Sequence, residues 1–262
     1  VPAFDLLRRD GPSQWVTAAD LPVGELRENA EVVRTLYLIS STRKTQIYSL
    51  TIDKPDPCIT WTEAMPATPE ETQSFFDTIP KESAARRPKS IYKINVTVRE
   101  RTEIEVDGKK QLRQMDLGLI ERKLLVSAVN GGSAPVGLKG RVLGDVSFLS
   151  GSIEGRIDLG NSFPADQDWT KDVALLAERP GLDLSLDTVA TTPNYLKVKL
   201  DALDPIDGRN HWRLRVTVPK GSVYTALPEG SAIVLNTTGP NPRRLRIPIR
   251  GQAYDRGTGP KL

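Results

Sequence analysis

The chain has 262 residues, with 36 basic and 33 acidic side chains and a formal net charge of +3. So small an excess does not indicate a nucleic-acid partner, because such proteins concentrate positive charge on one face. The one cysteine, Cys58, excludes an intramolecular disulfide. No apolar run approaches the roughly 20 residues of a membrane-spanning helix. The length is typical of about two domains.

In chain order, residues 1–14 combine mixed charge with a Gly-Pro break, and we expect an N-terminal arm there. Trp15 begins the first predicted strand. Apolar alternation or a continuous apolar run predicts further strands, since a period of two is typical of a half-buried strand. These lie at 21–24, 33–39, 46–52, 92–98, 124–130, 136–142, 172–177, 182–186, 212–218, 232–236 and 244–251.

A short helix and a long hairpin are expected within the first half. Thr68-Pro69-Glu70-Glu71 is typical of a helix start, with proline in the first turn followed by acidic residues, and predicts a helix over 69–76. Asp107-Gly108 separates two alternating segments, which is a strong hairpin signal. We interpret 99–115 as an inserted β-hairpin, because the second half has no equivalent segment.

One phrase occurs twice: Tyr-Lys-Ile-Asn-Val-Thr-Val at 92–98 and Trp-Arg-Leu-Arg-Val-Thr-Val at 212–218. The repeat predicts one β-domain present in two copies. The predicted fold class is therefore all-β, with two tandem immunoglobulin-like β-sandwiches. The copies are expected at 15–142 and 153–253, joined by a linker at 143–152 and followed by a tail at 254–262.

The C-terminal part of the second copy resembles a known family. The residues that carry the resemblance are Leu-Asn-Thr-Thr-Gly-Pro at 235–240 and Leu-Arg-Ile-Pro-Ile-Arg-Gly at 245–251. It is similar to the ASH/MSP-like immunoglobulin-fold domains, in particular a bacterial family of unknown function abundant in planctomycetes. The resemblance implies an exported, non-catalytic binding or scaffold module. Many relatives carry a Cys-x-Cys pair where this chain has Cys58-Ile59-Thr60, so a role of that pair in thiol or metal chemistry is not carried over.

No residue pattern predicts catalysis, a cofactor or a bound metal. His211 is the one histidine and precedes a strand, so a Ser-His-Asp triad and a histidine-rich zinc site have no support. Asp201, Asp204 and Asp207 with Gly208 form an acidic segment. Clustered carboxylates are what calcium prefers, yet the spacing is not that of an EF-hand, and a solvated turn is the simpler interpretation.

Arginines on two predicted strands and the hairpin turn are the candidate partner-binding residues. Their alternation with apolar residues favours a solvated face that protects the sheet against pairing. The alternative is contact with an acidic protein or polysaccharide. The candidates are Arg213, Arg215, Arg244, Arg246, Arg250, Asp107 and Gly108.

These patterns predict a structural or interaction protein of the cell envelope or of an extracellular assembly. Its contacts, with another protein or with copies of itself, would be made by the sandwiches and the hairpin arm. Export is expected from the family resemblance and from the start at Val1 rather than methionine. The alternative is a soluble module that binds carbohydrate or peptide, with Trp61 or Trp169 as a platform.

Overall fold

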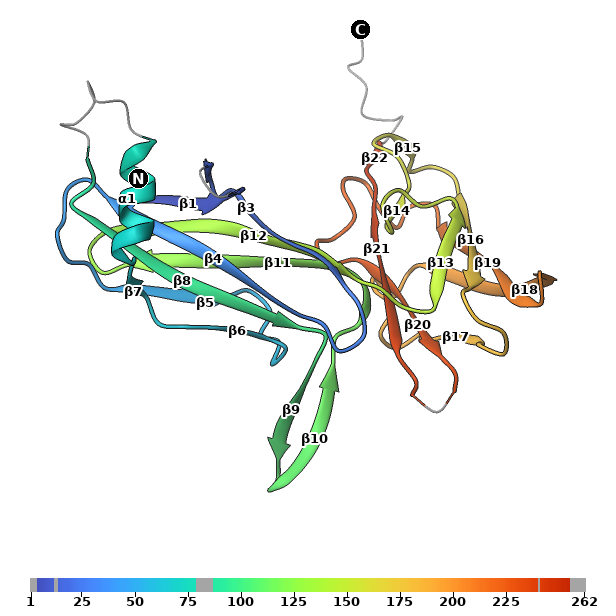
Figure 1. Ribbon diagram of the computed structural model, residues 1–262. Coiled ribbons are helices and arrows are strands. Elements are labelled where there is room, and N and C mark those ends of the chain that lie inside the picture. The colour runs from blue at the N-terminus through green and yellow to red at the C-terminus, as the bar shows by residue number, and fades with distance from the viewer. Residues whose placement is uncertain (1–3, 12–13, 79–86, 240, 255–262) are drawn as a thin grey trace, which may run out of the picture. The chain divides into compact units, whose positions relative to one another are not determined.

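The computed structural model describes residues 4–11, 14–78, 87–239 and 241–254. Over this part of the chain the regular structure is β-strand arranged in several sheets, with one short helix, which confirms the all-β prediction. The chain divides into two compact units (Figure 1). Unit 1 comprises Val1–Met115 and Ile120–Arg141, and unit 2 comprises Asp116–Leu119 and Val142–Leu262.

Unit 1 has two main sheets (Figure 1). One has the order β2-β1-β4-β8-β6, with β7 also paired to β8. Its strands are β1 Asp5–Arg9, β2 Trp15–Thr17, β4 Glu31–Ser40, β6 Ile59–Trp61, β7 Met65–Pro66 and β8 Ser90–Arg99. In the other, β11 pairs with β5 and β12, and β12 with β3. These strands are β3 Asp20–Leu26, β5 Tyr48–Ile52, β11 Leu117–Ala128 and β12 Gly132–Val142.

The core of unit 1 follows the period of two that the sequence shows. On β8, Ile94, Val96 and Val98 are buried and alternate with half-buried polar residues. Alternate side chains of a strand lie on opposite faces, so one face of each sheet supplies the core. Fully buried residues on the other strands include Leu36, Leu38, Leu21, Val23, Leu124, Val126, Val136 and Leu138.

The predicted helix is present as α1, Pro69–Asp77, and its start is fixed by a capping box. The hydroxyl of Thr68 accepts a hydrogen bond from the backbone N–H of Glu71, and the Glu71 carboxylate accepts one from the N–H of Thr68. This reciprocal pair satisfies donors that a helix end leaves open. Phe75 and Phe76 of the helix pack against a small cluster around Tyr37 on the sheet.

Glu71 also joins α1 to the sheet. Its carboxylate lies 2.8 Å from Nζ of Lys93 and accepts a 2.9 Å hydrogen bond from the Tyr37 hydroxyl. Burial raises the pKa of this carboxyl, but the bonds from Lys93, Thr68 and Tyr37 outweigh it, so its pKa lies below the usual value. Glu71 is therefore ionised at neutral pH.

We expect Glu71→Ala to lower the free energy of unfolding by about 1–3 kcal/mol. The substitution removes the cap and leaves a mostly buried ammonium group without its carboxylate. Urea unfolding measures the loss, and Glu70→Ala, at an exposed position in the same turn, is the matched control. Equal stability of the two variants would contradict a structural role for Glu71.

Unit 2 also has two main sheets. One has the order β13-β16-β19-β18, and in the other β20 lies between β17 and β21, while β21 also pairs with β14 and with Leu117 and Gly118 of β11. The strands are β13 Val146–Ser150, β14 Ile157–Asp158, β16 Trp169–Ala177, β17 Leu184–Leu186, β18 Lys197–Ile206, β19 Arg209–Val218, β20 Ala232–Thr237 and β21 Arg244–Arg250. A separate pair consists of β15 Phe163–Pro164 and β22 Ala253–Tyr254.

The two copies of the repeated phrase have equivalent positions in their units. On β8, Ile94 pairs with Leu36 and Val98 with Val32 of the antiparallel β4. On β19, Leu214 pairs with Val173 and Val218 with Trp169 of the antiparallel β16. Ile94 and Leu214, which occupy the same place in the phrase, are both buried. The second sheets of the two units are also arranged alike. In unit 1 the β11–β12 hairpin pairs with the antiparallel strand β5, and in unit 2 the β20–β21 hairpin pairs with the antiparallel strand β17.

Several expected boundaries are wrong. The N-terminal arm at 1–14 contains β1, which pairs with β2 and β4, and the linker at 143–152 contains β13, which pairs with β16. The segment at 116–119, placed in the first sandwich, belongs to unit 2. Of the predicted tail at 254–262, Tyr254 is in β22 and the rest lies outside the described residues.

Candidate functional site

The predicted hairpin is present as an arm of unit 1, made of β9 Arg101–Val106 and β10 Lys109–Gln114. It extends away from the sheets of its unit (Figure 1). Asp107 and Gly108 have φ of 52° and 73°, the positive values that the favoured two-residue hairpin turn requires. The two strands form a sheet of their own, and no other strand in the described ranges pairs with them.

The arm separates charge between its strands. β9 carries Glu103 and Glu105, while β10 carries Lys109, Lys110 and Arg113. Glu103 and Lys110 form a 3.3 Å ion pair across the arm, and both side chains are well exposed. Leu112 is 58% exposed on β10. The arm thus presents one acidic and one basic edge, with an apolar side chain open to solvent.

Polar contacts hold the base of the arm. The side chain of Glu100 is fully buried, and its carboxylate lies 2.8 Å from Nε of Arg101 and accepts a 3.0 Å bond from the N–H of Asn29. Arg101 also reaches Glu28 at 2.7 Å. The N–H of Met115 donates to the carbonyl of Glu100, which closes the base. A buried carboxylate paired in this way fixes the direction in which the arm leaves the sheet.

Cys58 lies beside the same base. Its side chain is buried, and its Sγ donates a 3.6 Å hydrogen bond to the carbonyl of Arg113. Burial raises the pKa of the thiol from 9.0 to about 12, and the charge of Asp56 acts in the same direction. A reactive cysteine needs a lowered pKa and access to solvent. Cys58 has neither, and its role in this structure is packing.

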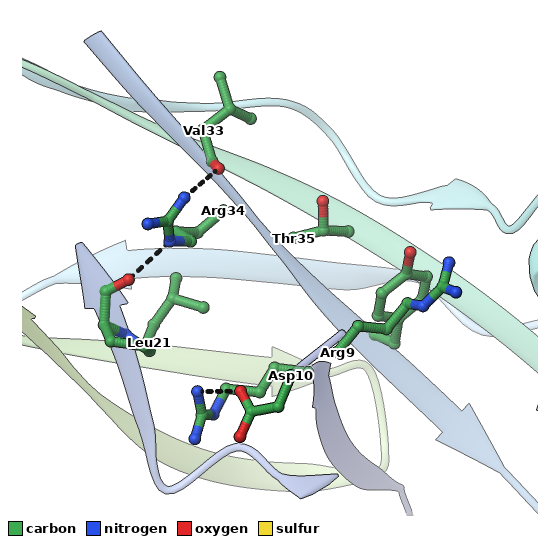
Figure 2. Close-up of a pocket in the computed structure, with 9 residues that line it drawn as sticks. Arg9, Asp10, Leu21, Val33, Arg34 and Thr35 are labelled. Carbon is green, nitrogen blue, oxygen red and sulfur yellow. Dashed lines mark hydrogen bonds and ion pairs between the residues drawn. The ribbon is translucent and has the colours of Figure 1, made fainter. Parts of the chain in front are cut away.

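A second feature is a cleft of about 440 Å³ in unit 1, where β1 separates from β4. β1 pairs with β4 as far as Leu7 opposite Tyr37, whereas its next two residues, Arg8 and Arg9, pair with β2 alone. The separation leaves a space bordered by β1, β3 and β4, shown in Figure 2. Its lining residues are Arg8, Arg9, Asp10, Leu21, Pro22, Val33, Arg34, Thr35 and Tyr37.

Three guanidinium groups and one carboxylate line this cleft. Arg34 is held by three backbone carbonyls: its Nε donates to Pro22 at 2.6 Å, and its two terminal nitrogens donate to Val33 and Val23. Arg8 pairs with Asp10 at 2.6 Å. Arg9 lies over the ring of Trp15, 5.4 Å from its centroid. The sequence patterns did not indicate this cluster, since Arg34 is distant along the chain from Arg8, Arg9 and Asp10.

The predicted arginines do not form one site, because they lie on two different sheets of unit 2. On β19, Arg215 makes a bidentate ion pair with Asp172 at 2.8 and 2.9 Å, and Arg213 lies 3.8 Å from Asp201. These pairs join neighbouring strands of one sheet.

The arginines of β21 lie on the other sheet and also have partners. Arg250 donates twice to Asp158, at 2.7 and 2.9 Å, and Arg246 donates to the carbonyl of Gly230 at 2.7 Å. Arg244 lies 3.9 Å from Asp116. These contacts account for the arginine pattern within unit 2.

The remaining candidates have structural positions. Asp207 and Gly208 form the two-residue turn between β18 and β19, and Asp201 lies within β18, paired with Lys199 at 2.7 Å. Among the described residues, no three Asp, Glu, His or Cys side chains come together as metal ligands would. His211 lies within β19. Trp169 donates to the carbonyl of Leu159 and stacks on Phe163, whereas Trp61 is 36% exposed.

Comparison with known proteins finds distant structural neighbours among the solved structures. No protein-family model and no curated protein matches the chain. A protein of unknown function from Porphyromonas gingivalis W83, known from its crystal structure, is 12% identical and has a TM-score of 0.36. The match covers 95% of this chain and 99% of that one. Within the described ranges, no helix has the length and apolar character needed to cross a membrane.

Proposed function

We propose that the chain is a non-catalytic structural or interaction protein whose β9–β10 arm pairs with a strand of a partner protein. The observation that carries the proposal is the arm itself: a two-stranded sheet with no other strand beside it in the described part of the chain. A free strand edge presents unpaired N–H and C=O groups to which another chain can add a strand.

The anchored base supports this function. An arm that is already ordered loses less conformational entropy on binding than a flexible segment. The buried Glu100 and its bonds to Arg101 and Asn29 provide that order. The tight turn at Asp107-Gly108 does the same at the tip.

The charges of the two edges limit which strands can pair with them. Like charges directly opposite each other on neighbouring strands are destabilising, and opposite charges are favourable. The edge of β9 therefore favours a basic partner strand, and the edge of β10, with Lys109, Lys110 and Arg113, favours an acidic one. A second copy of this chain offers both kinds of edge, so self-assembly is included in the proposal.

The proposal also includes two tandem immunoglobulin-like sandwiches as the body of the protein. It is supported by the repeated residues, which pair in the same way between β8 and β4 as between β19 and β16. The other main sheet of each unit also contains a hairpin, β11–β12 or β20–β21. A location in the cell envelope or outside the cell is proposed from the family resemblance.

Shortening the arm tests the function. Because Arg101 pairs with Gln114 across the arm, a Gly-Gly link can replace 102–113 and leave Arg101 beside the buried Glu100. We expect this variant to keep its β-sheet circular dichroism and to lose self-assembly, measured by size-exclusion chromatography with light scattering over a range of concentrations. Assembly that persists without the arm, or a full chain that is always monomeric, would contradict self-assembly through the arm.

Charge reversal supplies the matched control. Lys109→Glu with Lys110→Glu and, separately, Glu103→Lys with Glu105→Lys are each expected to weaken assembly, since each makes an edge repel its former partner. Arg213→Glu, at a position on the outer face of unit 2, should leave assembly unchanged. If all three variants assemble like the wild type, edge charge does not select the partner.

A further inference from the structure

We propose that the cleft lined by Arg8, Arg9 and Arg34 is a binding site for an oxyanion, either a carboxylate or a phosphate, on a hydroxylated ligand about the size of a monosaccharide. The proposal concerns a site separate from the arm and does not depend on the function proposed above. It rests on the charge and the size of the cleft, and on a buried donor of Arg8 that has no acceptor among the described residues.

The charge of the cleft favours an anion. Its lining contains three guanidinium groups against the one carboxylate of Asp10. Arginine presents its N–H groups in a planar fork that matches the oxygens of a carboxylate or phosphate. Arg34 is already fixed by the carbonyls of Pro22, Val33 and Val23, so little of its freedom remains to be lost when a ligand binds.

One donor in the cleft has no acceptor. The Nε of Arg8 is buried and has no hydrogen-bond partner among the described residues, although Asp10 engages another nitrogen of the same group. Buried polar atoms are nearly always hydrogen-bonded, and an exception calls for an explanation. Because this Nε is buried, an oxygen of a bound anion can reach it only when the Arg8 side chain turns toward the cleft.

Size and lining indicate the rest of the ligand. A volume of about 440 Å³ lies within the range of small-molecule sites, roughly 300–1,000 Å³. Leu21, Pro22 and Val33 provide an apolar wall on which the face of a sugar ring can pack. Asp10 can accept hydrogen bonds from hydroxyl groups near the anion. Figure 2 shows Arg9, Asp10 and Thr35 around the same opening.

Calorimetric titration of the full chain at low salt tests the site, with glucuronate, glucose 6-phosphate and glucose as probes. We expect at least one anionic probe to bind in the millimolar range and glucose to bind at least tenfold more weakly. The stronger of the two anions assigns carboxylate or phosphate as the preferred group, and equal affinity assigns oxyanions in general. The proposal would be overturned if glucose bound with the same affinity as both anions, or if neither anion bound.

Variants locate the binding. Arg8→Gln and Arg9→Gln are each expected to weaken binding of the anionic probe at least tenfold, while Arg215→Gln, at an ion-paired arginine of unit 2, leaves it unchanged. Two separate cleft variants keep the test valid if one of them does not fold, which circular dichroism checks. Unchanged affinity in a folded cleft variant would place the anion elsewhere and reject the site.

Discussion

Raising the pH from about 9 to about 12 is expected to unfold unit 1 before unit 2. Unit 1 buries three groups whose pKa values are raised: the pKa of Tyr37 and that of Tyr48 lie at about 12 rather than 10.0, and the pKa of Cys58 lies at about 12 rather than 9.0. Burial is the largest cause in each case. In unit 2, burial also raises the pKa of Tyr195, but this side chain is only half-buried, while Tyr224 and Tyr254 are exposed.

The direction follows from proton linkage. The unfolded chain releases these protons near pH 9–10, whereas the folded chain holds them to a higher pH. The stability that they contribute is complete below the unfolded pKa values and is lost as the pH rises toward 12. At about 1.4 kcal/mol for each pH unit between the two pKa values, the three groups together approach the whole stability of a small domain, about 5–15 kcal/mol.

Methyl NMR during an alkaline titration follows the two units separately, through Ile94 in unit 1 and Ile247 in unit 2. Tyr48→Phe is expected to move the unit 1 transition to higher pH at little cost at neutral pH, because the Tyr48 hydroxyl is buried without a partner in the described structure. Tyr224→Phe, at an exposed tyrosine of unit 2, is the control. Unfolding of unit 2 at a lower pH than unit 1 would contradict this explanation. So would a double variant, Tyr48→Phe with Cys58→Ala, whose unit 1 unfolds at the same pH as in the wild type.

What could be predicted from the sequence depended on local chemistry. The turn at Asp107-Gly108 needs two residues with positive φ, and Asp-Gly supplies them, so this hairpin was predictable. The start of α1 was predictable for a similar reason, since Thr68, Pro69 and Glu71 each act within one turn. Alternation on β8 and β19 identified buried faces because the strand period decides which side chains face the core.

The missed features depend on contacts between distant segments. β1 is rich in charge and β13 lies between Gly144 and Gly151 in the predicted linker, and their strand structure comes from pairing with β4 and β16. β18 was missed because Asp201, Asp204 and Asp207 were interpreted as an acidic turn, although Asp207-Gly208 is again a hairpin signal. The cleft was missed because Arg8 and Arg34 meet only once β1 and β4 are neighbours.

The same contrast applies to the arginines. Arg213 and Arg250 look alike in the sequence, each alternating with aliphatic residues. In the structure, Arg213 is paired with Asp201 and Arg250 with Asp158. The two ion pairs lie on separate sheets. By contrast, Arg8 and Arg9, in a segment with no clear pattern, line an open cleft. Charge pattern along a strand reports exposure, whereas the presence of a binding site depends on which partners the fold supplies.

Ile94→Ala and Leu214→Ala are expected to cost similar amounts, each about 2–5 kcal/mol of the free energy of unfolding of the unit that carries it. Both side chains are buried, at 1% and 0% exposure, and both lie at the same register position of the strand that holds the repeated phrase. Truncating a large aliphatic side chain in a packed core loses its burial and leaves a cavity. Equal costs would mean that the phrase has the same packing role in both units.

Hydrogen–deuterium exchange with mass spectrometry assigns each loss to its unit. Ile94→Ala should reduce amide protection in β4 and β8, and Leu214→Ala should reduce it in β16 and β19. Thr97→Ala and Thr217→Ala, three residues further along the same strands on the outer face, are matched controls and should cost about 0.5 kcal/mol or less. A core variant no worse than its control would show that one copy of the phrase is not a core strand, and the proposal of two like-folded sandwiches would fail with it.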